Sequence, residues 1–143
     1  MESYYYIRNN EYEILNMTNQ VGNHYKESAR LLRAISHPVR LAILEILNEV
    51  DEACVCHLEA LLGYRQAYLS QHLMCLREHN LVSDRRFGRN IYYRINQKGV
   101  ASIIQETRNC TLTKKMDFHA EDCVCPECER EKFLKNSEKK EVI

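Results

Sequence analysis

The chain has 143 residues and equal numbers of basic and acidic side chains, so its net charge of zero does not by itself indicate a nucleic-acid partner. The length suits one domain with tails, and no apolar run approaches the roughly 20 residues that cross a bilayer. Met1 to Asn10 lacks the apolar stretch of a signal peptide, so we expect a cytoplasmic protein with no membrane partner and with reduced thiols.

The N-terminal third predicts an arm and two helices. Residues 1–10 are polar and tyrosine-rich, which is typical of a loose arm. Apolar residues recur at helical spacing from Glu11 to Ile35, on a mixed face that suits packing against a partner. Pro38 fits the first turn of a second, buried helix, with Ser36 as its predicted N-cap.

The central part predicts two further helices and a hairpin. A short helix is expected at about Cys56–Leu62, ended by Gly63, and a longer one from Gln66 to His79. The apolar face of the longer helix should comprise Leu69, Leu73 and Leu76, with Leu81 just beyond. Two alternating stretches then predict strands at Val82–Arg86 and Ile91–Ile95, joined by a turn over residues 87–90.

The C-terminal part predicts one more helix and a tail. Asn96 is the expected cap of the helix, and charged residues dominate from Thr113 onward, with a short helix expected near Glu127–Leu134. We therefore expect an arm (1–10), a DNA-binding and dimerisation domain (11–112) and a charged, cysteine-containing tail (113–143).

This order of elements predicts a mainly α fold with a small β-hairpin wing, the winged helix-turn-helix. Segment 65–94 carries six arginines against two acidic residues, a local basic patch that can attract a polyanion. Polar side chains at the start of the longer helix could enter a major groove, and arginines on the hairpin could meet phosphates or a minor groove. The alternative is an ordinary α+β domain with solvated polar faces. The predicted DNA-binding residues are Arg65, Gln66, Tyr68, Ser70, Gln71 and His72 on the helix, and Arg85, Arg86 and Arg89 on the wing.

Four stretches together resemble the ArsR/SmtB repressors. They are LLRAISHPVRLAIL (31–44), RQAYLSQHL (65–73), LREHNLV (76–82) and GRNIYYRI (88–95). The resemblance implies a homodimer formed through the first and last helices, and a repressor that leaves double-stranded operator DNA when an effector binds. Two-fold symmetry would place the recognition helices in successive major grooves, roughly 34–36 Å apart. No nucleophile motif or phosphate loop is present in the sequence, so we do not expect an enzyme.

The cysteines predict how such a repressor is switched. Thiolates favour soft ions such as Zn(II), Cd(II), Pb(II) and As(III). Cys54 and Cys56 are two residues apart, and their side chains can converge only if Cys54 precedes the helix. In the family that the chain resembles, such a pair belongs to arsenic-sensing and cadmium/lead-sensing branches. However, Glu59 stands where the arsenic branch has a third cysteine, and Met1 to Lys26 lacks the cysteines that the cadmium/lead branch adds.

The missing thiols could come from the tail. The central hypothesis is that Cys123, Cys125 and Cys128, from the same or the partner subunit, complete the site of Cys54 and Cys56. Alternatively the tail thiols and His119 form a separate zinc site, the thiols are redox sensors that form a disulfide or polysulfide, or the tail thiols are inert. His57 and Cys110 are weaker candidate ligands, and Cys75 is expected to be a buried small hydrophobe.

Overall fold

The computed structural model describes residues 11–118, 123, 125–126 and 129–130. The predicted arm and most of the predicted helix near Glu127–Leu134 lie outside these residues. The chain divides into two units, residues 1–34 and 35–143. The first contains helix α1 (Glu11–Ile35) almost entirely. Within the described residues, no helix is long and apolar enough to span a membrane.

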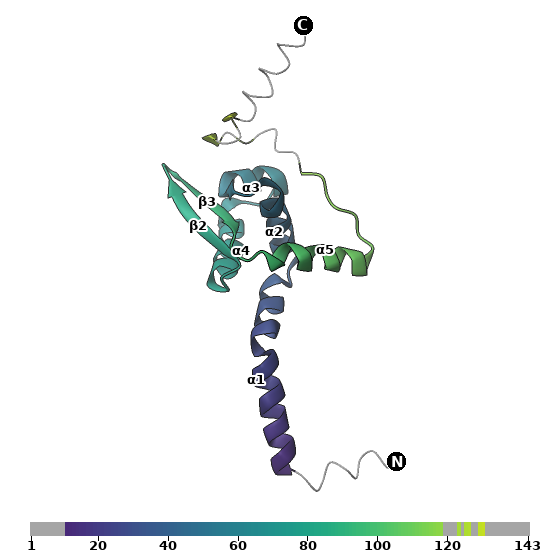
Figure 1. The fold of residues 1–143 in the computed structure, drawn as a ribbon. Helices are drawn as coiled ribbons and strands as arrows, with labels where there is room; N and C mark the ends of the chain where they lie inside the picture. The colour runs from purple at the N-terminus through teal and green to yellow at the C-terminus, as the bar shows by residue number, and fades with distance from the viewer. Residues whose placement is uncertain (1–10, 119–122, 124, 127–128, 131–143) are drawn as a thin grey trace. The chain divides into compact units, whose positions relative to one another are not determined.

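In the part of the second unit that the structure describes, helices α2 to α5 surround a small antiparallel sheet (Figure 1). Its strands are β1 (Ala53–Cys54), β2 (Val82–Phe87) and β3 (Asn90–Ile95), in the spatial order β1-β3-β2. Helices α3 (Val55–Leu62) and α4 (Gln66–Glu78) pack against one another, and α2 (Pro38–Val50) contacts α4, β3 and α5 (Gly99–Thr111). The order helix, short helix, longer helix and hairpin is the winged helix-turn-helix, as predicted.

The core lies between α2, α4 and the sheet. Ile43 and Leu44 of α2 and Leu58 of α3 are fully buried. The predicted apolar face of α4 is confirmed, because the side chains that were expected on it are also fully buried. These are Leu69, Leu73, Leu76 and Leu81. Replacing one such leucine by alanine typically costs about 2–5 kcal/mol, so this face fixes α4 firmly on the domain.

Two predicted helix caps were wrong. Pro38 occupies the first turn of α2, so the cap falls on His37, whose extended backbone lets its Nδ1 accept from the Val39 amide. The last helix has Lys98 rather than Asn96 at its N-cap. The Asn96 side-chain amide instead donates to the Asn80 carbonyl groups, at the turn that leaves α4.

Candidate thiol site and nucleic-acid interface

The turn from β1 into α3 brings Cys54 and Cys56 together. Cys54 ends β1 and is the N-cap of α3, and its Sγ accepts a hydrogen bond of 3.3 Å from the His57 amide. Cys56 lies in the first turn of α3. The two Cα atoms are 5.4 Å apart and the sulfurs are joined as a disulfide. The convergence expected for a cysteine just before a helix is therefore present.

The structure also brings two tail cysteines to this pair. The sulfur atoms of Cys54, Cys56, Cys123 and Cys125 all lie within 4.8 Å of one another. Cys54, Cys123 and Cys125 are almost completely buried and pack against Tyr92 of β3, whereas Cys56 is partly exposed. All four belong to one chain. We call these four residues the thiol cluster.

The chemistry of the thiol cluster suits a soft ion. Four sulfurs at about 2.3 Å from a central Zn(II) would be roughly 3.8 Å from each other in a tetrahedron. After reduction, the bonded sulfurs of Cys54 and Cys56 would have to move apart to this spacing, whereas the more distant pairs, all within 4.8 Å, would have to approach only slightly. Ligand cysteines must be deprotonated thiolates, so an ion can enter only after the Cys54–Cys56 disulfide has been reduced. Three of the thiolates would suffice for an ion that prefers three sulfur ligands.

Ion pairs connect α5 and the first residues after it to α2. Arg108 of α5 pairs with Glu45, and Lys115 of the tail pairs with Glu49 one turn further along α2. The helix end is closed by Leu112 in a left-handed conformation, with φ of 54°. The first residues after α5 are therefore held on the domain that carries Cys54.

Among the described residues, the group of converging thiols does not include the other candidate ligands His57 and Cys110. His57 follows Cys56, and its backbone amide donates to the Cys54 sulfur. Cys110 is exposed near the end of α5. Cys75 was expected to be a buried hydrophobe, but it is half-buried and its sulfur accepts a hydrogen bond from the Arg40 guanidinium. Cys128 and His119 lie outside the described residues.

The start of α4 presents the predicted polar surface. Arg65 is the N-cap of α4, and Gln66 and Gln71 of the helix are exposed. Tyr68 is 39% exposed and its ring lies between those of Tyr64 and His72. Ser70 is half-buried. The arrangement offers amide and guanidinium groups at one end of a helix whose opposite face is fixed in the core.

His72 lies against the protein rather than on the exposed surface of α4. Its ring lies 4.3 Å from that of His37, centroid to centroid, and its Nε2 is buried. Burial, and then the nearby His37 and Arg40, hold the pKa of His72 below its usual value. The neutral imidazole is thus favoured at neutral pH, and this residue suits packing of α4 on α2 better than phosphate contact.

The wing carries its three arginines in different settings. Arg86 and Arg89 are exposed towards the tip of the hairpin, where Gly88 adopts a φ of +60°. Arg85 is exposed as well, but its Nε and Nη2 each donate to the Glu52 carboxylate at 2.6 Å. A phosphate would have to displace that carboxylate to reach the same two nitrogens.

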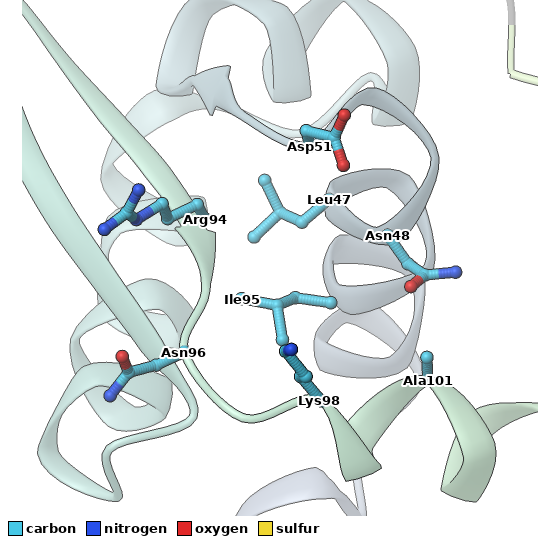
Figure 2. Close-up of a pocket in the computed structure, with 8 residues that line it drawn as sticks. All are labelled: Leu47, Asn48, Asp51, Arg94, Ile95, Asn96, Lys98 and Ala101. Atoms are coloured by element: carbon cyan, nitrogen blue, oxygen red, sulfur yellow. The ribbon is translucent and has the colours of Figure 1, made fainter.

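A separate cavity of about 500 Å³ opens between the end of α2, β3 and the start of α5 (Figure 2). Leu47 and Ile95 lie at its centre, whereas the polar ends of Asn48 and Arg94 point outwards (Figure 2). Asp51 and Lys98 also line the cavity, and the Lys98 side chain ends beside Ile95 (Figure 2).

Comparisons with known proteins identify the family. The family model described as "Bacterial regulatory protein, arsR family" matches residues 37–84. The arsenical resistance operon repressor of Escherichia coli K12 is 35% identical over 88 residues, which span 59% of this chain and 75% of the relative. The chain belongs to the ArsR family.

Two further relatives show the breadth of this family. A biofilm growth-associated repressor of Xylella fastidiosa is 40% identical, over 62% of this chain and 79% of its own. The structure of AntR, an antimony-specific transcriptional repressor, superposes with a TM-score of 0.55 and 28% identity, covering 61% of this ArsR-family chain and 78% of that protein. The family and its structures are DNA-binding transcriptional regulators, not enzymes.

Proposed function

We propose that this ArsR-family protein is a cytoplasmic repressor that releases operator DNA when a soft ion binds the thiol cluster. The observation that carries the proposal is the convergence of four sulfurs, from two segments more than 60 residues apart, within 4.8 Å. As(III), Cd(II), Pb(II) and Zn(II) are the candidate ions, because all favour thiolate ligands. Cys128 and His119 are further candidate ligands from the tail.

The position of the thiol cluster explains how binding would reach DNA. Cys54 and Cys56 begin α3, and α3 packs against α4, the helix that presents Arg65, Gln66 and Gln71. An ion that draws the tail sulfurs onto this turn would shift α3 and favour a shape that fits DNA less well. A coupling free energy of roughly 1–3 kcal/mol is typical of such switches.

The deciding experiment titrates ions onto the reduced protein bound to an operator fragment that has been selected in vitro. We expect Cd(II) or As(III) to weaken operator binding about 5- to 150-fold, and a chelator or competing dithiol to restore it. Operator affinity, measured by fluorescence anisotropy at fixed salt, gives the result. Unchanged affinity with every one of the four ions would contradict the proposal.

A second candidate function is a thiol redox switch, favoured by the disulfide between Cys54 and Cys56. In that case an oxidant alone, in the absence of metal, would release DNA by forming this bond, and an inorganic polysulfide would do so by oxidising the two thiols and inserting sulfur between them. Reversal by a reducing thiol but not by a chelator would identify it. The same titration, with an oxidant as an additional arm, therefore separates the two candidates.

We also propose that the protein acts as a homodimer through α1. Val21, Tyr25 and Leu32 are each more than half exposed and fall within about 40° of one another around the helix. A Tyr25→Asp substitution is expected to shift the protein to monomers at micromolar concentration, because it would bury a charge in the interface. Sedimentation velocity measures this. Asn23→Asp places the same charge on the opposite face of α1 as the control, and equal behaviour of the two variants would argue against this interface.

A further inference from the structure

A row of three residues crosses the sheet from the thiol cluster to the wing. Cys54 of β1 is paired with Tyr92 of β3, and Tyr92 is paired with Arg85 of β2. Directly paired residues of neighbouring antiparallel strands have their side chains on the same face. The Arg85 guanidinium accordingly lies over the Tyr92 ring, 5.1 Å from its centroid, and Tyr92 packs against Cys54 and the tail cysteines.

An ion pair also connects Arg85, at one end of this row, to the segment that precedes Cys54, at the other end. Glu52 lies two residues before Cys54 and accepts two hydrogen bonds from Arg85, both of 2.6 Å. Two parallel bonds of this kind fix the direction of the guanidinium as well as its distance. The segment that carries the first cysteine is therefore tied to the wing twice, through Tyr92 and through the carboxylate of Glu52.

We propose that Glu52 and Arg85 are positioning residues that transmit the occupancy of the thiol cluster to the wing. This inference rests on the function proposed above. When an ion sets the spacing of the sulfurs, Cys54 moves and carries Glu52 with it. Because Arg85 is bound to that carboxylate and packs on Tyr92, β2 moves with Glu52. The exposed Arg86 and Arg89 near the hairpin tip are then displaced from their positions on DNA. Arg85 thus acts within the protein rather than as a direct DNA contact.

The pair is suited to a test by substitution because it adds little to stability. The side chains of Arg85 and Glu52 are 49% and 24% exposed, and solvent screens exposed ion pairs so that most contribute little to stability. Glu52→Gln should therefore fold. Its far-UV circular dichroism and the ultraviolet absorption of its Cd(II)–thiolate complex check the fold and the site directly.

The test compares operator affinity with and without Cd(II) in the full-length reduced protein. For Glu52→Gln we expect Cd(II) affinity within about twofold of the parent. The ratio of operator affinity without Cd(II) to that with Cd(II) should be about 2- to 30-fold smaller than in the parent. Arg85→Lys keeps the charge but cannot form the two parallel hydrogen bonds, so it should show the same loss of response. Combining Glu52→Gln with Arg85→Lys should reduce the response no further.

Asp84→Asn is the matched control. Asp84 neighbours Arg85 on β2 and pairs with Arg77 of α4 at 3.4 Å, but it lies on the other face of the sheet from the row. This variant should respond to Cd(II) like the parent. The inference is overturned if Glu52→Gln also responds like the parent, or if its response falls only as far as its Cd(II) affinity does. A parent protein that keeps its operator affinity in Cd(II) would instead refute the proposed function, and the inference with it.

Discussion

The double substitution Cys123→Ser/Cys125→Ser is expected to weaken Cd(II) binding at least about 100-fold and to abolish release of DNA by Cd(II). The reason is that it removes two of the four sulfurs that converge in the structure. Loss of an outer-shell partner alone typically costs about 10- to 100-fold in metal affinity, so loss of two ligands should cost more. Competition with a chromophoric chelator measures the affinity, and operator binding measures the response.

Two further variants make this result interpretable. Cys110→Ser removes an exposed cysteine outside the thiol cluster and should leave both quantities unchanged. Cys54→Ser distinguishes a shared site from a separate tail site, because a separate site would still bind Cd(II) with the parent's affinity. A double tail variant that still responds like the parent would exclude the tail from the sensor.

The second large effect is expected at the DNA surface. Gln71→Ala removes an exposed amide from α4, and a lost bidentate contact to a base costs about 1–3 kcal/mol of discrimination. Operator affinity should fall about 5- to 150-fold, while binding to unrelated DNA changes little. Anisotropy titrations with both DNAs measure the ratio.

Arg89→Ala serves as the contrasting variant on the wing. A phosphate contact has no base preference, so its loss should weaken binding to both DNAs equally. The slope of the logarithm of the binding constant against the logarithm of the salt concentration should fall in magnitude by about one. Equal losses for both DNAs in Gln71→Ala would show that this glutamine does not read bases.

Local patterns predicted most of the fold. The bounds of α4 and the two wing strands depend on spacing within a few residues, and the leucines predicted to be buried on α4 are buried. The two-residue strand β1 was not predicted, because it is defined only by pairing with Tyr92 and Tyr93, nearly 40 residues away. The cap at His37 could have been found, since a proline at the first helical position fixes the cap on the residue before it.

The candidate site was less accessible to sequence reasoning. The convergence of Cys54 and Cys56 could be predicted, because it depends only on where the short helix begins. Their meeting with Cys123 depends on how the chain returns after α5, which no local spacing encodes. The engagement of Arg85 by Glu52 is likewise non-local, whereas the place of this arginine on the predicted hairpin assigned it to DNA.

The Lys115–Glu49 ion pair has a consequence for how sensitively the protein could respond. Lys115 pairs with Glu49 of α2, and only residues 116–122 separate this contact from Cys123 in the sequence. Tethered thiols meet their partners at an effective concentration that depends on tether length and stiffness rather than on protein concentration. The ion concentration that triggers release would then be set by this short tether, and it could shift between related proteins through changes in tail length while every sulfur ligand stays the same.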